Sequence, residues 1–226
     1  PRNFGDKKLV GDIITEDEIW ACTTCGACEQ ECPIFIEYID KIVDMRRYLI
    51  EQGALPQSLQ KPLQQIKKKG NAYGAVKSKR SAWTKDLEGH EVRELKKGDK
   101  ADLLFFVDSC GSFDPRIQEI TKSFARILSK AACDFGILGQ DEYDSGNEVR
   151  RIGEEGLFEQ VSEKNVEAFE ARDFRQIVTH DPHAFNVIRN DYPKKFPVAH
   201  SSQLLSRFIR ENKIKLSADY IRGRRV

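Results

Sequence analysis

A closely spaced group of cysteines dominates the N-terminal part of the sequence. Cys22, Cys25, Cys28 and Cys32 are separated by two, two and three residues, and Pro33 follows the last of them. This spacing is typical of bacterial ferredoxin loops that hold a 4Fe–4S cluster. Thiolates three positions apart on a tight loop can each bind a different iron of one cubane. The sequence therefore predicts that these four cysteines are the ligands of one 4Fe–4S cluster.

Two other interpretations of the cysteine group are a structural zinc site and a chance accumulation. Zinc ligands normally come as two pairs across a longer gap, and the run 22–32 lacks such a gap. The role of Cys32 also has two alternatives, because the fourth cysteine of such a run ligates the other cluster in two-cluster ferredoxins. Either Cys32 closes a single cluster, or it reaches a second cluster whose cysteine run lies outside this sequence.

Charge and hydropathy exclude several classes of protein. The 37 Lys and Arg residues balance 36 Asp and Glu residues, so no basic field predicts a nucleic-acid partner. The longest apolar run, 103–107, is far shorter than the roughly 20 residues of a membrane helix, so we expect no transmembrane segment in this chain. Clustered thiols without a visible signal peptide indicate a reducing compartment, and we expect a cytoplasmic location. The first residue is Pro1 rather than Met, which indicates a segment of a longer chain or a processed one.

The chain divides into three predicted parts. Residues 1–53 carry the cysteine run and an expected amphipathic helix over 34–52. Residues 54–100 are rich in lysine with little apolar periodicity, which predicts a basic linker or wrapping segment, partly helical over 58–69. Its basic face is either simply solvated or docks to an acidic partner or to anionic lipid. Residues 101–226 show the pattern of an α/β domain.

Short apolar runs alternate with amphipathic helices in this last part. The expected strands are 102–107, 135–138, 176–179 and 196–199. The expected helices begin at Asp114-Pro115, near Leu157, at Pro182, and at Ser201 or Ser202, one of which we expect to cap the last helix. Strands that alternate with helices predict a parallel sheet covered on both faces. The predicted fold class is therefore α/β, with a small α-helical, ferredoxin-like cluster segment before the sheet.

Eight stretches of the chain carry a resemblance to one family. They are 20–28, 42–48, 70–74, 107–111, 148–153, 177–179, 181–186 and 192–193. The sequence resembles heterodisulfide-reductase-related iron–sulfur proteins with a cysteine-rich (CCG) domain, and among these it looks most like the iron–sulfur part of membrane-bound electron-transfer-flavoprotein:menaquinone oxidoreductases. The resemblance covers nearly the whole chain and implies a CCG-type α/β domain over 101–226.

The resemblance also implies where a second cluster would be bound. Family members carry a lone Cys, then Cys-Cys-Gly, then Cys-x-x-Cys, and these thiolates hold a further cluster. Here the lone cysteine is Cys110, while the later positions read Asp144-Ser145-Gly146 and Asp181-Pro182-His183-Ala184. Because soft thiolates select iron–sulfur clusters, we expect no second cluster and no disulfide-reducing chemistry at this degenerate site.

The replaced positions leave two alternatives for the degenerate site. Asp144, Asp181, His180 and His183 would lie near Cys110 if the family fold is kept, and carboxylates with imidazoles suit zinc, iron or manganese. The other interpretation is a polar pocket whose groups are satisfied by hydrogen bonds within the protein. We expect the polar pocket, and elemental analysis distinguishes the two.

These observations together favour a non-catalytic, electron-transfer component of an oxidoreductase. We expect the cluster to relay single electrons within a larger complex and the degenerate CCG domain to act as a docking scaffold. Expected partners are a flavoprotein or a further iron–sulfur subunit, and a membrane quinone-reducing module is another candidate. Such a module, or a missing part of the chain, would hold the protein peripherally at a membrane. The alternatives are a catalytic heterodisulfide-reductase-like subunit and an iron–sulfur redox sensor.

Overall fold

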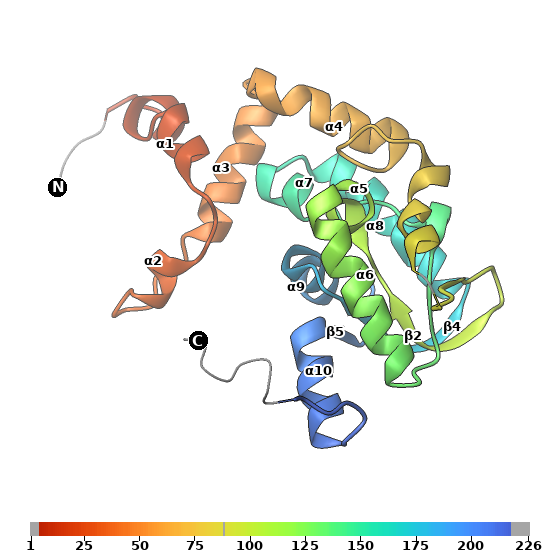
Figure 1. The fold of residues 1–226 in the computed structure, drawn as a ribbon. Coiled ribbons are helices and arrows are strands. Elements are labelled where there is room, and N and C mark those ends of the chain that lie inside the picture. The colour runs from red at the N-terminus through yellow and green to blue at the C-terminus, as the bar shows by residue number, and fades with distance from the viewer. Residues whose placement is uncertain (1–4, 88, 218–226) are drawn as a thin grey trace.

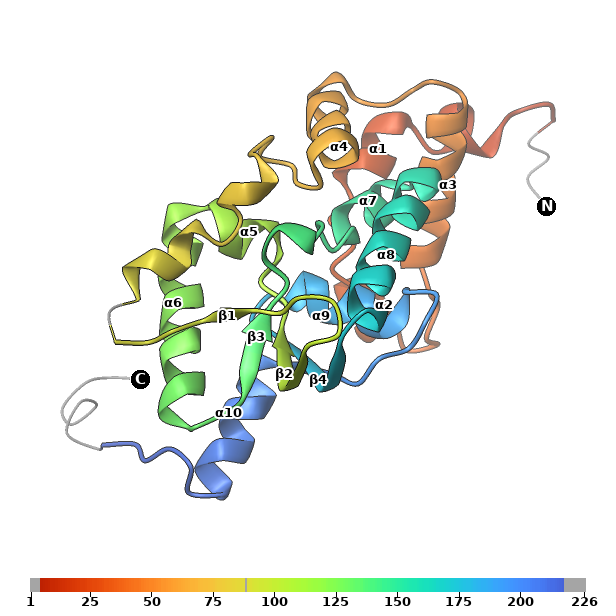
Figure 2. The ribbon, with the colours of Figure 1, turned by 90° about the vertical axis from the view of Figure 1, so that its right-hand side faces the viewer.

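A parallel sheet forms the centre of the molecule. The computed structural model describes residues 5–87 and 89–217. The sheet has five strands in the order β1-β3-β2-β4-β5, and every pair of neighbours is parallel. Figure 2 shows β1, β3, β2 and β4 side by side. The strands are β1 (Arg93–Glu94), β2 (Lys100–Phe105), β3 (Phe135–Ile137), β4 (Asp173–Thr179) and β5 (Val198–His200). The predicted α/β class is confirmed.

Helices precede the sheet and connect its strands. The N-terminal elements are η1 (Leu9–Ile13), α1 (Glu16–Ala21), α2 (Ala27–Gln30), α3 (Ile39–Glu51), α4 (Gln57–Lys69), η2 (Lys77–Lys79) and η3 (Ala82–Asp86). The later elements are α5 (Asp108–Phe113), α6 (Pro115–Lys130), η4 (Gly139–Asp141), α7 (Asn147–Ile152), α8 (Glu155–Glu170), α9 (Pro182–Asn190) and α10 (Ser201–Arg210). Of the helices in the described ranges, none has the length and apolar character needed to cross a bilayer.

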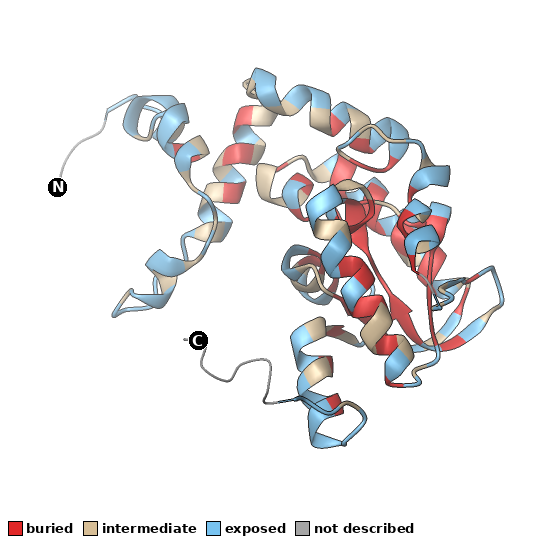
Figure 3. Cartoon of the chain, viewed as in Figure 1, coloured by how far each residue is buried: buried red, intermediate tan, exposed pale blue. Residues whose placement is uncertain are grey.

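The sheet is covered on both faces, because successive side chains of its central strand enter two different cores. Leu104 and Phe106 pack with residues of α4, α8 and α9, whereas Leu103 and Phe105 pack with residues of α6 and α10. This division follows from the alternation of side chains along a strand. Figure 3 shows the buried residues gathered in the sheet and on the inner faces of these helices, while the segment around α1 and α2 is mostly exposed.

Helix α3 starts later than the sequence predicted. It begins at Ile39 rather than at position 34, because Phe35 has a left-handed φ of 54° and Glu29 Oε1 accepts the backbone N–H groups of Tyr38 and Ile39, both at 2.6 Å. Phe35 and Tyr38 are apolar residues within the helix predicted over 34–52, but they precede α3 and are 80% and 43% exposed.

Two further details differ from the sequence prediction. Strand β1 lies within 54–100, the segment predicted to be a linker, and two residues are too few to show a strand pattern. The last helix is capped by His200 rather than by Ser201 or Ser202: His200 Nδ1 accepts from the N–H of Ser202, and the Gln203 side chain accepts from the N–H of His200. The predicted start of α6 is confirmed, with Asp114 as its N-cap.

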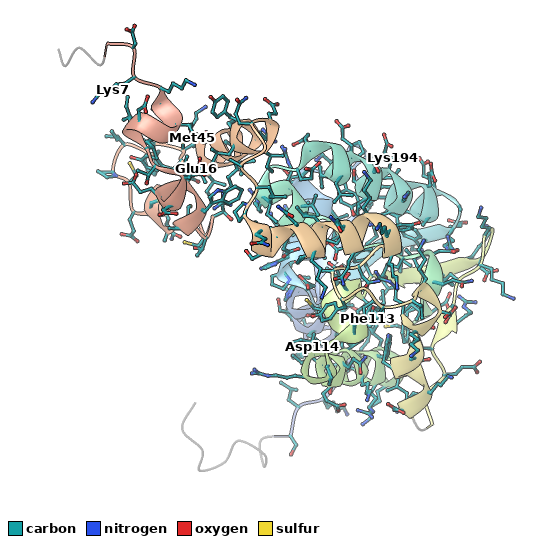
Figure 4. All side chains as sticks on the ribbon, turned by 90° about the horizontal axis from the view of Figure 1, so that it is seen from above. Lys7, Glu16, Met45, Phe113, Asp114 and Lys194 are labelled. Carbon is teal, nitrogen blue, oxygen red and sulfur yellow. The ribbon has the colours of Figure 1, made fainter. Side chains whose placement is uncertain are left out.

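Helix α3 fixes the cluster segment against the α/β domain. Gly153, which ends α7, has a φ of 91°, and a Cβ at this position would lie 2.8 Å from the backbone nitrogen of Arg47. Only glycine therefore allows this approach. Arg47 also forms an ion pair with Glu155, with Nη2 2.8 Å from Oε2. Figure 1 shows α1 to α3 beside the α/β domain, and Figure 4 shows Met45 among these N-terminal helices and Phe113 on the domain.

The order of the strands reverses around β2. From β2 the chain passes to β3 on one side, and it then returns past β2 to β4 on the other side. Ligand sites of open parallel sheets lie at such a reversal, outside the carboxyl ends of the strands. The segment after β2 carries Cys110, and the segment after β4 carries Asp181. The fold thus brings the two outer segments of the degenerate site to the same edge of the sheet.

Candidate metal centre

The four predicted cluster ligands lie on the segment between α1 and α3. Cys22 ends α1, and Gly26, with a left-handed φ of 77°, precedes the single turn of α2. All four cysteines are free thiols. Cys25 and Cys28 are exposed, and Cys22 and Cys32 are half-buried. The segment therefore presents four thiols at the surface of the protein.

Backbone N–H groups of this segment point at cysteine sulfurs. The nitrogen of Thr24 lies 3.4 Å from Cys22 Sγ, and that of Ile36 lies 3.3 Å from Cys32 Sγ. The backbone N–H of Ile36 is the chief cause of a lowered pKa of Cys32. The backbone N–H of Ala27 likewise lowers the pKa of Cys25. The thiolate is the metal-binding form of cysteine, and N–H donors to sulfur tune cluster potentials. This set of donors fits a thiolate-ligated cluster.

The thiols are not arranged around a single point. In the part of the chain that the structure describes, no three His, Cys, Asp or Glu side chains lie close enough together to hold one metal ion. A cubane differs from a mononuclear site, since each of its thiolates binds a different iron.

A buried hydrogen-bond network occupies the degenerate site. Asp108 Oδ1 accepts from the N–H of Ser145 at 3.0 Å, and Asp144 Oδ2 accepts from Ser109 Oγ at 2.6 Å. Burial raises the pKa of both carboxyls, and the charge of Asp144 raises that of Asp108 further. Because each carboxyl holds a proton more readily than an exposed one would, the two acids can lie in the same buried region without strong repulsion.

A third buried carboxyl, Glu142, has a direct ion-pair partner. Arg80 Nη1 lies 2.9 Å from Glu142 Oε1, and the two side chains are 3% and 1% exposed. Glu142 also accepts from the backbone N–H groups of Val107 and Asp108, at 3.1 and 2.9 Å. Arg80 comes from the segment between α4 and β1, so this pair ties that segment to the loop after β3, and Glu142 in turn connects it to the residues that follow β2.

The remaining predicted residues of the degenerate site already have protein partners. Asp181 caps α9, where its Oδ1 accepts from the N–H of His183 at 2.7 Å. His183 Nδ1 lies 2.5 Å from Glu148 Oε1 at the surface. His180 is half-buried, with Nε2 2.8 Å from Thr121 Oγ1, and burial lowers its pKa.

A cavity of about 380 Å³ lies beside Cys110. Its wall is largely apolar and comes from α4 and α7, while Tyr73, Ser109, Asp144 and Glu148 add polar groups. Tyr73 Oη lies 3.6 Å from Cys110 Sγ. Of the predicted second-site residues, only Cys110 and Asp144 line this cavity.

The cysteine-rich (CCG) family model matches residues 104–189, from within β2 to the last turn of α9. Residues 104–189 are a CCG domain. The resemblance stated from the sequence is thereby confirmed, and the matched range includes Cys110, Asp144, Asp181 and His183.

Curated relatives of this CCG-domain chain match it along nearly its whole length. The "Probable iron-sulfur-binding oxidoreductase FadF" of Bacillus subtilis (strain 168) is 42% identical over 92% of this chain and 30% of the relative. The EtfAB:quinone oxidoreductase of Syntrophomonas wolfei is 33% identical over 94% of this chain and 30% of the relative. A component of the dihydromethanophenazine:CoB–CoM heterodisulfide reductase of Methanosarcina barkeri is 25% identical over 94% of this chain and 53% of the relative.

This chain spans less than a third of the first two relatives and about half of the third. It is homologous to oxidoreductases, of which one is named for iron–sulfur binding. No solved structure matches the chain.

Sequence reasoning missed several buried charged residues, among them Arg46, Arg80, Asp108 and Glu142. The pattern of α3 contained a signal for the first of them. Val43, Arg46 and Leu49 are the buried residues of that helix, so a charged side chain occupies its apolar stripe. Charged residues are almost never fully buried unless they are paired, and such a position therefore marks a functional candidate.

Proposed function

We propose that this chain is the electron-transfer segment of a larger oxidoreductase and binds one 4Fe–4S cluster through Cys22, Cys25, Cys28 and Cys32. A bound cluster supplies one-electron exchange. The chain's own residues hold the thiolates on a short segment, donate backbone N–H groups to two of the sulfurs, and leave two of the thiols exposed where a redox partner can approach. The observation that carries the proposal is this surface segment of four free thiols, held by α3 against a CCG domain.

We further propose that the CCG domain acts as a docking scaffold rather than as a second redox centre. Asp144 and Ser145 replace thiols and take part in a buried hydrogen-bond network, and Asp181 caps a helix. Cys110 alone cannot supply the soft ligand set that a second cluster needs. The neighbouring cavity adds the carboxyl groups of Asp144 and Glu148 but no further thiol.

We propose partners for this chain from the names of its relatives. One relative is named an EtfAB:quinone oxidoreductase, and another, from Chromohalobacter salexigens, a "Probable membrane-anchored ferredoxin". We propose an electron-transferring flavoprotein or another iron–sulfur subunit as donor, and a quinone-reducing membrane module as acceptor. The chain would then work on the cytoplasmic side, held at the membrane by a partner or by another part of a longer protein.

The test is the metal content and spectrum of the anaerobically reconstituted chain. We expect about four irons and four sulfides per chain, with one cubane EPR signal after reduction. Cys25→Ser should lose most of the iron, whereas Cys110→Ser, the matched control at the degenerate site, should retain it. Cys32→Ser decides whether Cys32 closes this cluster, since retention of the cluster would place the closing ligand elsewhere.

Other outcomes would contradict parts of the proposal. Bound zinc, or no cubane signal in the reconstituted chain, would refute the electron-transfer role. About eight irons, or loss of iron in Cys110→Ser, would refute the scaffold role of the CCG domain. Turnover of a disulfide substrate by the chain alone would favour the catalytic alternative.

A further inference from the structure

Arg46 is a buried guanidinium at the junction of the cysteine segment and the CCG domain. Its Nη2 donates to the carbonyl oxygens of Ile19 and Cys22, at 3.0 and 2.5 Å, and its Nη1 donates to the carbonyl of Arg151 at 2.8 Å. The guanidinium carbon lies 5.2 Å from the centre of the Trp20 ring. One side chain, 5% exposed, thus contacts the end of α1, the first cysteine of the run and α7.

No acid balances the charge of Arg46 within the described residues. Arg46 takes part in none of the ion pairs found in 5–87 and 89–217, although its neighbour Arg47 pairs with both Asp44 and Glu155. The Nε atom of Arg46 is buried and has no hydrogen-bond acceptor. All of its hydrogen bonds go to neutral carbonyl oxygens.

A buried charge without a partner is costly, so a structure that retains one normally supplies a counter-charge. Two of its three carbonyl contacts, with Ile19 and Cys22, lie at the end of α1 and at the first cysteine of the run. The counter-charge therefore belongs on the side of the cysteine segment.

We propose that Arg46 is the positioning residue and counter-cation of the cluster held by the cysteine segment, a role that rests on the proposed function. A thiolate-ligated cubane carries a net negative charge, and reduction adds one electron to it. The cation of Arg46 favours the reduced form and so raises the reduction potential. Its hydrogen bonds to the carbonyl groups of Ile19 and Cys22 hold the first ligand of the run in place.

The expected effect on the potential is large enough to measure. A unit charge within about 12 Å of a redox centre, at an effective dielectric constant of about 20, changes a one-electron equilibrium about tenfold. A tenfold change corresponds to about 59 mV for one electron. Net charge near a cluster is one of the factors that set its potential.

The experiment is an EPR-monitored redox titration of the cluster-loaded full chain, with dithionite as the reductant. Arg46→Gln should shift the potential to more negative values, by about tenfold in the equilibrium constant, while Arg46→Lys keeps the charge and should stay close to wild type. Arg47→Gln is the matched control, because it removes a neighbouring charge that acids already balance, and it should leave the potential unchanged.

A second readout separates the charge of Arg46 from simple packing. Arg46→Gln should reduce the rise in thermal midpoint that cluster loading produces, because the apoprotein does not need the counter-charge. If Arg46→Gln and wild type have equal reduction potentials at equal iron content, the inference is overturned. It is also overturned if Arg46→Gln lowers the thermal midpoint equally in the apo and the cluster-loaded forms. Loss of the cluster from Arg46→Gln but not from Arg46→Lys supports the charge role, and loss from both overturns it. A wild-type chain without a cubane signal refutes the proposed function itself, before any variant is compared.

Discussion

Removing Arg80 should destabilise the CCG domain by leaving Glu142 buried without its cation. Breaking one side of a buried ion pair typically costs about 3–5 kcal/mol. In Arg80→Met, Glu142 keeps the two backbone donors of Val107 and Asp108 and can also take up a proton. Both effects limit the loss of stability, so we expect the free energy of unfolding to fall by about 3 kcal/mol at neutral pH. For a domain of this size, that corresponds to a fall in thermal midpoint of roughly 6–12 °C.

The pH dependence of this loss follows from the protonation of Glu142. Burial already raises the pKa of Glu142 in the wild-type protein, and Arg80 acts in the opposite direction. Removing Arg80 therefore raises that pKa further. A carboxyl whose pKa is raised on folding stabilises the fold at low pH, and this contribution is lost as pH rises through the folded-state pKa. The difference between variant and wild type should thus be small in acid and grow as Glu142 must ionise.

The assay is urea unfolding of the apoprotein at a series of pH values, with wild type and Arg80→Met side by side. Arg175→Met is the control, since Arg175 and Asp102 form an ion pair whose side chains are 85% and 56% exposed. Exposed pairs contribute about 0–1 kcal/mol, so this control should change little. A loss below about 1 kcal/mol in Arg80→Met at neutral pH, or a loss that does not vary with pH, would refute the reasoning.

Four further substitutions test other parts of the structure by the same unfolding assay. Gly153→Ala should cost about 1–3 kcal/mol, because φ is 91° there and a Cβ would lie 2.8 Å from a backbone nitrogen of α3; a neutral result would show that α3 can move away from α7. Asn165→Ala should cost about 2–3 kcal/mol, since Asn165 Nδ2 donates to the carbonyl of Asp144 at 3.0 Å and to Tyr192 Oη at 2.9 Å in a buried region. Tyr192→Phe should cost less, and equal costs would contradict the assignment of the network to Asn165. Asp114→Ala removes the N-cap of α6 and should cost about 1 kcal/mol, whereas an unchanged midpoint would show that the cap does not contribute.

The sequence predicted the elements whose signals are local. The buried strands β2, β3 and β4 and the Asp114-Pro115 start of α6 follow from short patterns of apolar residues and from capping chemistry. The N-cap role of His200 could not be predicted in this way, because histidine is an uncommon cap. Strand β1 could not be predicted either, because two residues are too few to show an alternating pattern of apolar residues. The start of α3 depends on Glu29, whose carboxylate caps backbone N–H groups nine and ten residues further on.

For the candidate site, too, the sequence predicted the local features and missed those that depend on distant parts of the chain. The spacing of the cysteines predicted the segment, but it could not identify Arg46, whose importance comes from a contact with α7 in another part of the chain. Sequence mapping placed Asp144 and Asp181 at one site with Cys110. Asp144 does line the cavity beside Cys110, whereas Asp181 instead caps α9. A side chain near a site can serve the backbone around it, and spacing alone does not distinguish these roles.

The degenerate site also has a structural logic of its own. A cluster bound by thiolates from several loops would cross-link those loops, so loss of the thiols removes a constraint on the edge of the sheet. In this chain, two hydrogen bonds join the start of α5 to the loop before α7: Asp108 accepts from Ser145, and Asp144 accepts from Ser109. The ion pair of Glu142 with Arg80 connects the same edge to the segment after α4. Buried polar groups with satisfied hydrogen bonds can rigidify and specify a unique arrangement. These contacts join the loops directly, as the proposed scaffold role of the CCG domain requires.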